Sequence, residues 1–256
     1  MGIGVVYENV LSVEATWRQL ETADGATLSA DVRALVEDCT HPEALKALAD
    51  ELGASWREAW GRQWGRDSAR AGDATAGYDA LNDAAFRALS RCTKPTLAMI
   101  HGFCLGGGLA VALCTDIRLA DDNAEFAIPA AKLGLGYNAR WVRPLLAAVP
   151  PAKAKEMLFT GRRFKVAEAQ AMGLVNAVVP SSELEARTLA LAGEIAANAP
   201  LTVRAAKRTI DELVRHPQTP DLAALDAAVA ACFESEDYAE GRLAFKEKRK
   251  PRFQGR

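Results

Sequence analysis

The segment HGFCLGGGLAVALCTDIRLA, residues 101–120, places three adjacent glycines between two apolar runs. The run before it, TLAMI at residues 96–100, is short and is ended by His101 and Gly102, which predicts a buried strand. Residues 106–114 are apolar almost all round, which predicts a buried helix. The glycines therefore fall at the turn from a strand into a helix, and this order constrains the fold more than any other feature.

A glycine turn of this kind presents backbone amides to a ligand. The first N–H groups of a helix have no partner inside it, and the helix dipole is positive at that end. The missing side chains of Gly106, Gly107 and Gly108 let a ligand atom come close to the backbone. The turn therefore suits an anion or an oxygen that gains negative charge during a reaction. The structural alternative is a glycine turn needed only for tight packing of helix on sheet.

Two other glycine loops do not fit the sequence. A phosphate-binding P-loop continues with Gly-Lys-Ser/Thr, whereas Leu109 and Ala110 follow Gly108. A dinucleotide-binding turn needs G-x-G-x-x-G, and GFCLGGG has a different spacing. An oxyanion hole for a thioester carbonyl remains as the third option.

Composition narrows the class of protein. The chain has 256 residues, half of them hydrophobic, which suits one large domain. A net charge of −2 gives no global attraction for nucleic acid or a membrane surface. Five cysteines without a CxxC pair indicate free thiols rather than a metal site or disulfides. With no signal peptide and no apolar run of about 20 residues, we expect a cytoplasmic protein without a bound metal.

Strand and helix patterns alternate up to about residue 180, and only helix patterns follow. Strands are expected at 116–120, 124–128 and 174–179, and helices at 78–91, 151–160 and 166–173. Gly161 and Gly173 end the last two helices. Residues 181–250 are expected to form four helices, which makes an α/β core with a helical C-terminal subdomain.

Three stretches resemble the enoyl-CoA hydratase/isomerase family, also called the crotonase superfamily. They are KPTLAMIHGFCLGGGLAVALCTDIRLADDNAEFAIP, AKEMLFTGRRFKVAEAQAMGLVNAVVP and SEDYAEGRLAFKEKRKPRF, which fall in the family's order within roughly residues 68–256. The resemblance implies a crotonase-like ββα spiral core over residues 67–195. It implies a helical region at 196–256 that serves oligomerisation and coenzyme A contact.

The same resemblance implies a role for the glycines. In that family two backbone N–H groups hold the thioester oxygen of an acyl-CoA and stabilise the enolate formed from it. Gly107 corresponds to the middle glycine that supplies one donor, with Gly106 and Gly108 beside it in the substrate-binding turn. The implied partner is an acyl-CoA, with no cofactor other than the coenzyme A of the substrate, and the implied assembly is a homotrimer or homohexamer. Lyase or isomerase chemistry of fatty acid metabolism is the implied activity.

The sequence departs from the hydratases at both catalytic glutamates. The corresponding residues are Ala110, three residues after Gly107, and Ala130, after the proline of EFAIP. Neither methyl group can transfer a proton. The family resemblance therefore implies acyl-CoA binding, while the two alanines argue against hydratase turnover.

The segment LGLGYN, residues 133–138, resembles the Leu-Gly-x-x-Tyr-Asn of methylmalonyl-CoA decarboxylases. Decarboxylation needs no base to start, and the Tyr137 hydroxyl could orient the departing carboxylate. A packed aromatic side chain is the alternative for Tyr137. Asn138 stands where dienoyl isomerases and aryl-CoA dehalogenases have an aspartate, and as an amide it is expected to bind substrate rather than act as a base.

Near the C-terminus, Phe245 and Lys248 match the family's contacts to the coenzyme A adenine and phosphates. A positive charge beside an apolar ring suits phosphate and adenine. In the family this contact reaches the ligand of a neighbouring subunit. A solvated basic tail is the alternative.

Residues 1–66 form an atypical segment. The family has a strand here that ends in Ser/Cys-Ala-Gly-Ala-Asp and gives the second oxyanion donor, and residues 12–66 contain no such motif. Trp56, Trp60 and Trp64 are four residues apart, which indicates an aromatic binding stripe or local helix packing. A further hypothesis is that this segment is translated out of frame. A non-catalytic CoA-binding protein is then the rival function from another class.

Overall fold

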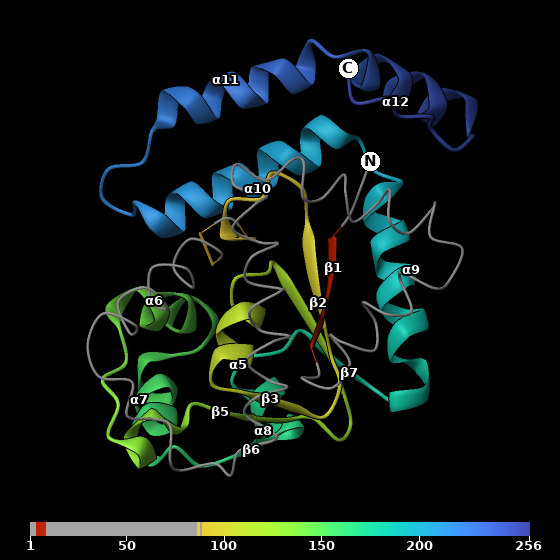
Figure 1. Cartoon of the computed structure of the whole chain (residues 1–256). Coiled ribbons are helices and arrows are strands. Elements are labelled where there is room, and N and C mark those ends of the chain that lie inside the picture. The colour runs from red at the N-terminus through yellow and green to blue at the C-terminus, as the bar shows by residue number, and fades with distance from the viewer. Residues whose placement is uncertain (1–3, 9–85, 88) are drawn as a thin grey trace, which may run out of the picture.

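The computed structural model of the chain describes residues 4–8, 86, 87 and 89–256 (Figure 1). Of the helix expected at 78–91, residues 86, 87, 89 and 90 are helical, and the part before residue 86 lies outside the described residues. The three tryptophans and almost all of residues 1–66 also lie outside them, so the hypotheses about that segment stay as they are.

A parallel sheet of four strands forms the centre of the fold. Its order is β1 (Gly4–Glu8), β2 (Thr96–Ile100), β4 (Ile117–Asp121) and β7 (Ala177–Val179). The strand expected at 96–100 is confirmed at both ends, and those expected at 116–120 and 174–179 are confirmed with shifted or shorter bounds. The sequence did not predict β1, which pairs with β2 from Gly4 opposite Thr96 to Glu8 opposite Ile100.

A second, smaller sheet carries the segment that leads to the glycines. It consists of β3 (Phe103–Leu105), β5 (Glu125–Ala127) and β6 (Phe164–Lys165). β3 and β5 run parallel, and β5 and β6 run antiparallel. The expected strand at 124–128 is confirmed as β5, whereas β3 and β6 are too short to give a periodic pattern.

The helices follow the expected alternation. They are α5 (Gly107–Ala112), α6 (Ala139–Ala148), α7 (Pro151–Thr160), α8 (Val166–Ala171), α9 (Leu184–Ala196), α10 (Pro200–Arg215), α11 (Leu222–Phe233) and α12 (Glu236–Glu247), with short 3₁₀ turns at Pro129–Leu133 and Ser181–Glu183. The helices predicted at 106–114, 151–160 and 166–173 and the four C-terminal helices are confirmed. The sequence reading did not predict α6.

The parallel sheet separates two apolar clusters. Every side chain of β2 is buried, as expected for a strand covered on both faces. Since side chains alternate along a strand, Ala98 and Ile100 join the cluster that includes α5, α7 and α8. Leu97 and Met99 point to the other cluster, where α9 contributes Leu184. Both faces of the sheet are therefore covered (Figure 1).

The helical C-terminal region is bonded to the amino ends of the sheet strands. Lys207 on α10 donates to Asp116 Oδ2 at 2.6 Å and to the Lys94 carbonyl at 2.9 Å. The same Asp116 oxygen accepts from the Thr96 amide at 2.7 Å, just where β2 begins. The expected boundary between core and helical region, at residues 195 and 196, falls at the end of α9. None of the described helices is long and apolar enough to cross a membrane.

One buried aspartate joins the carboxyl ends of three parallel strands. Asp121 ends β4, and its Oδ1 accepts from the amides of Gly102 and Asn123 at 3.3 and 3.2 Å. Its Oδ2 accepts from Ser181 Oγ, beyond β7, at 2.6 Å. The same oxygen is bonded to His101 Nδ1, directly after β2. The carboxylate thus fixes the point where the chain leaves β2 for β3 and the glycine turn.

Replacing Asp121 by asparagine should lower the free energy of unfolding by about 2–3 kcal/mol, because hydrogen bonds to a buried carboxylate are lost. Chemical denaturation followed by circular dichroism measures the change. Asp226→Asn is the matched control, since Asp226 is exposed on α11. A loss below about 0.5 kcal/mol for Asp121→Asn would contradict the role given to this carboxylate.

Candidate functional site

Gly106 makes the turn from β3 into α5. Its φ of 56° and ψ of −116° lie in a region that side chains disfavour. Its amide donates to the Ala127 carbonyl at the end of β5, at 2.8 Å. Its carbonyl accepts from the Ala110 amide at 3.1 Å and so begins the helix. The turn is therefore anchored to the small sheet on one side and to α5 on the other.

Gly107 is the first residue of α5 and is exposed. Its amide has no acceptor within the part of the chain that the structure describes, as is usual at the start of a helix. Among the described residues, a Cβ built on Gly107 would meet no heavy atom within 4 Å. Packing against the described residues therefore does not demand a glycine at this position. Gly108 follows in the same turn and is half-buried.

Ala110 and Ala130, which the family resemblance aligns with the hydratase glutamates, are both buried. Ala110 lies on α5, one helical turn after Gly107. Ala130 lies in the 3₁₀ turn Pro129–Leu133 and belongs to the larger apolar cluster. Neither methyl group can transfer a proton, so the expectation drawn from these two alanines stays a prediction.

Tyr137 lies before α6, half-buried against the larger apolar cluster. Its ring meets the Trp141 ring edge to face, with centroids 5.6 Å apart, and Trp141 meets Phe86 in the same way at 6.2 Å. Burial, and to a smaller extent the nearby Cys114 sulfur, raises the pKa of Tyr137 to about 12. The hydroxyl is therefore a neutral donor at physiological pH, and among the described residues it has no hydrogen-bond partner.

The surroundings of Tyr137 link it to the end of α5. Cys114 follows that helix and donates from Sγ to the Ala110 carbonyl at 3.2 Å. The structure thus brings Tyr137 close to the helix that Gly107 begins. The sequence reading missed the roles of Cys114 and Trp141, although the spacing of four residues from Tyr137 to Trp141 is a helical signal.

Asn138 has a structural task. It is the N-cap of α6, and its Oδ1 accepts from the Arg140 amide at 3.0 Å. Its backbone carbonyl accepts from the amides of Trp141 and Val142 at 2.9 and 3.0 Å. The cap occupies the side-chain oxygen, so substrate binding by Asn138 stays a prediction for its amide NH₂ group.

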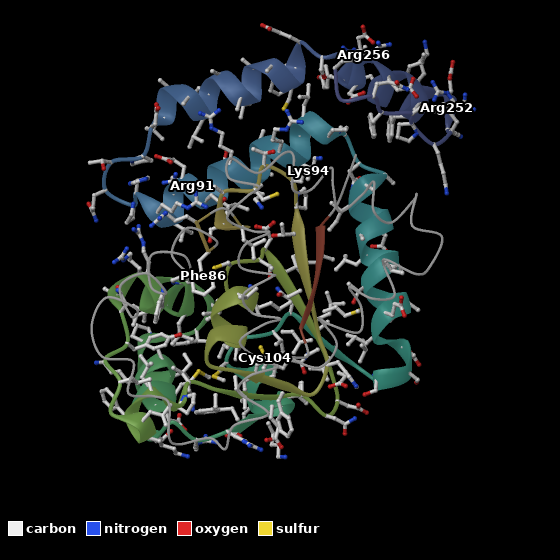
Figure 2. The ribbon with its side chains drawn as sticks, in the orientation of Figure 1. Phe86, Arg91, Lys94, Cys104, Arg252 and Arg256 are labelled. Carbon is white, nitrogen blue, oxygen red and sulfur yellow. The ribbon has the colours of Figure 1, made fainter. Side chains whose placement is uncertain are left out.

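Phe245 and Lys248 lie elsewhere in the fold. The Phe245 side chain is 87% exposed on α12, and Lys248 directly follows that helix. Figure 1 shows α12 at the far end of the helical layer from α5. In Figure 2, Arg252 and Arg256 lie beside α12, well away from Cys104 on β3. Within one chain, these two residues are not brought to Gly107 and Tyr137.

Comparison with known proteins agrees with this arrangement. The sequence profile of the enoyl-CoA hydratase/isomerase family matches residues 65–256. The chain belongs to the enoyl-CoA hydratase/isomerase family. The match confirms the resemblance over roughly residues 68–256 and leaves the segment before residue 65 unmatched.

Two curated relatives of this family member illustrate the likeness. The chain is 36% identical over 173 residues to the short-chain-enoyl-CoA hydratase of Clostridium acetobutylicum. The matched segment covers 68% of this chain and 66% of the relative. It is 40% identical over 167 residues to the carnitinyl-CoA dehydratase of Proteus mirabilis. That matched segment covers 64% of this chain and 64% of the relative. The matched part thus spans just under two thirds of these relatives.

A solved structure confirms the fold. The enoyl-CoA hydratase/carnithine racemase of Magnetospirillum magneticum is 37% identical and superposes with a TM-score of 0.70, over 74% of this chain and 71% of that one. The family member therefore has the crotonase-like α/β core with helices at its C-terminal end that the sequence predicted.

Tyr137 should titrate near pH 12, above the ordinary tyrosine pKa of about 10. The raised pKa means that the neutral side chain adds stability below about pH 10, which is lost as pH rises toward 12. Subtracting the alkaline phenolate absorbance of Tyr137→Phe from that of the unaltered chain isolates this group. A difference step centred near pH 10 in folded protein would contradict the burial described here.

Proposed function

We propose that this family member binds an acyl-CoA and that the Gly107 amide donates to the thioester oxygen. The single observation that carries the proposal is the exposed glycine at the start of α5, whose amide has no acceptor among the described residues. Its missing Cβ leaves a space free of atoms of the described residues, which supports close approach of a carbonyl. Negative charge that builds on this oxygen in an enolate would strengthen the hydrogen bond and stabilise the transition state.

The proposal does not include hydratase turnover. The two relatives named above are a hydratase and a dehydratase. Addition of water needs one group to activate the water and another to protonate carbon. Ala110 and Ala130 offer buried methyl groups at the corresponding positions. Enolate stabilisation alone favours a reaction in which the electron pair comes from a breaking carbon–carbon bond.

Decarboxylation of an acyl-CoA is the second candidate, and Tyr137 favours it. The C–C bond to the carboxylate breaks, CO₂ leaves, and the electron pair passes to the thioester as an enolate. A proton then adds to the α-carbon. The Tyr137 hydroxyl is neutral, close to α5 and without a partner among the described residues, so it could orient the carboxylate and supply that proton.

A non-catalytic CoA-binding protein is the rival from another class. The second oxyanion donor of the family comes from a motif that residues 12–66 lack. With only the Gly107 amide, the thioester would be bound but weakly polarised. Product analysis separates this rival from the two catalytic candidates.

Assembly into a homotrimer or homohexamer is part of the proposal. Phe245 lies far from the α5 of its own chain, which suits a contact to the ligand of a neighbouring subunit. Large apolar side chains are exposed on α10 and α11, which supports burial between subunits. They are Ile210, Leu213, Val214, Leu222, Val229 and Phe233. Light scattering of the purified chain measures its mass in solution. The mass of a monomer would contradict the proposed assembly.

Gly107→Pro tests the amide directly. Proline fits the first position of a helix and lacks only the N–H. We expect turnover to fall by about 10²–10³-fold with no change in the stability of the fold. Gly107→Ala is the control for crowding, because it keeps the amide and its Cβ meets no protein atom. If Gly107→Pro turned over substrate as fast as the unaltered chain, the proposed hydrogen bond from the Gly107 amide to the thioester oxygen would be refuted.

The reaction is tested with two substrates, crotonyl-CoA and methylmalonyl-CoA, by mass analysis of the products. We expect CO₂ release from the second and no hydration of the first. Tyr137→Phe should lower decarboxylation by about 10²–10⁴-fold. Tyr238→Phe should not, since Tyr238 is an exposed residue on α12. Hydrated crotonyl-CoA would refute the argument from the alanines, and CoA binding without turnover would favour the non-catalytic rival.

A further inference from the structure

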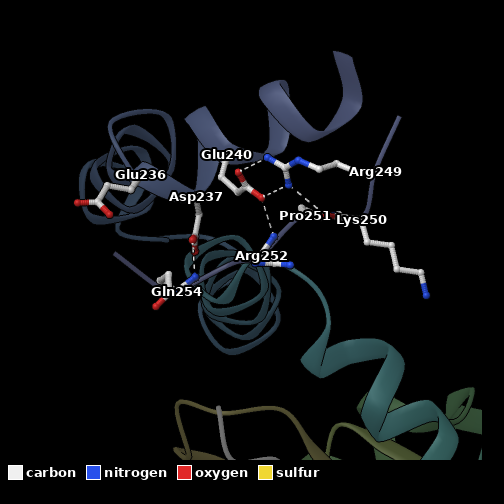
Figure 3. A pocket seen from close by; sticks show the side chains of 8 residues that line it. All are labelled: Glu236, Asp237, Glu240, Arg249, Lys250, Pro251, Arg252 and Gln254. Carbon is white, nitrogen blue, oxygen red and sulfur yellow. Dashed lines mark hydrogen bonds and ion pairs between the residues drawn. The ribbon is translucent and has the colours of Figure 1, made fainter. Parts of the chain in front are cut away.

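The last residues of the described chain fold back along α12. Asp237, on the first turn of that helix, has a side chain that is only 2% exposed. Its Oδ1 accepts from the Gln254 amide at 2.6 Å, and its Oδ2 accepts from the Gly255 amide at 2.8 Å. Its own amide donates to the Arg256 carbonyl at 3.3 Å. One buried carboxylate therefore fixes the far end of this C-terminal tail, residues 249–256 (Figure 3).

Glu240, one turn further along α12, fixes the near end of the tail. Its two oxygens receive the paired Nη1 and Nη2 groups of Arg249 at 2.5 and 2.8 Å. Oε1 also accepts from the Arg252 amide at 2.8 Å. Figure 3 shows these bonds at the wall of a cavity of about 730 Å³ between the helix and the tail. Hydrogen bonds first from Arg249 and then from Arg252 lower the pKa of Glu240 to about 2. The carboxylate thus stays charged at any physiological pH.

Two packing contacts also hold the tail between these two anchors. The Phe253 ring lies over Gly241 of α12, so a Cβ on that glycine would come within 3.5 Å of it. Gly255 lies against Pro200 at the start of α10, where a Cβ would come within 3.3 Å of that ring. The tail is therefore held against two helices as well as by the two carboxylates.

Lys248 stands at the bend between α12 and the tail, and its backbone is strained. Its φ of 56° is the positive value of a left-handed turn, and no other non-glycine residue in the described part of the chain has one. The Arg249 amide donates to the Ala244 carbonyl at 3.0 Å, and the Lys248 amide donates to the Phe245 carbonyl at 3.3 Å. This is the helix ending in which glycine is usually found. A lysine in this conformation is held by the contacts on either side of it.

We propose that Asp237 and Glu240 are positioning residues for coenzyme A. By holding the tail back along α12, they hold the bend at Lys248, which follows the exposed Phe245 at the end of the helix. This inference rests on the proposed function, in which those two residues meet the phosphates and adenine. Neither carboxylate touches the ligand, since both are occupied by the tail.

Calorimetric titration with coenzyme A alone tests the inference on the full chain. Glu240→Gln keeps the size of the side chain and loses its charge, and its Kd for coenzyme A should rise about tenfold. Glu234→Gln is the matched control, because Glu234 is exposed just before α12. It should bind like the unaltered chain. Lys248→Gly removes the ammonium and suits the left-handed turn, so it should weaken binding while raising the thermal midpoint.

The double variant separates positioning from general destabilisation. If Glu240 acts through Lys248, Glu240→Gln should weaken binding no further once Lys248→Gly is present. Both single variants should also reduce the salt dependence of Kd, because a phosphate contact is lost. Unchanged binding by Glu240→Gln, or additive losses in the double variant, would overturn the inference alone. If the unaltered chain does not bind coenzyme A, the proposed function fails and this inference fails with it.

Discussion

The hydrogen bond from the Gly106 amide to the Ala127 carbonyl is the interaction on which the site depends. It holds the glycine turn to the end of β5, so that α5 starts at a fixed point above the small sheet. Because this bond satisfies the amide of Gly106, the amide of Gly107 is the first in the turn with no acceptor among the described residues. The strand, the turn and the helix thereby place the amide of Gly107 at the start of α5, in the first turn where amides have no acceptor within the helix.

Under the proposed function, Ala110 and Ala130 stand where the family's hydratases have their two glutamates. Both methyl groups are buried, and Tyr137 brings a hydroxyl that burial keeps protonated. Such a set of groups can polarise a thioester and donate a proton. It offers no carboxylate to take one up at these positions. The chemistry proposed for this chain is therefore one whose electron pair is already present in the substrate.

Sequence reasoning located the elements that carry their own local signal. The strand at 96–100 and the helix at 151–160 are bounded by prolines and glycines, and both were placed to the residue. Strands β3 and β6 have three and two residues and exist only because β5 lies between them. Helix α6 contains Pro144, which hides a helical pattern in a sequence reading.

In the candidate site, too, features with a local sequence signal could be predicted, and features that depend on long-range contacts could not. The glycine turn was predicted because strand, glycines and helix are adjacent in the sequence, and Gly107 does begin α5. The bonds of Asp121 join residues that lie as many as 60 positions apart, so no local pattern reveals them. The hydrogen bond from the Gln254 amide to Asp237 spans 17 positions. It depends on a left-handed bend at Lys248, which a lysine at that position does not predict. Long-range polar contacts of this sort are visible only once the chain has folded.

Strand β2 has a consequence for how the two halves of the core respond to stress. Its alternate side chains belong to different apolar clusters, with Ile100 in one and Leu97 in the other. If α9 separated from the sheet, Leu97 and Met99 of β2 would become exposed to water. The same strand supports the apolar cluster beneath α5 on the other face of the sheet. Because both apolar clusters share β2, the two layers of the core are expected to unfold together in one transition rather than at two separate temperatures.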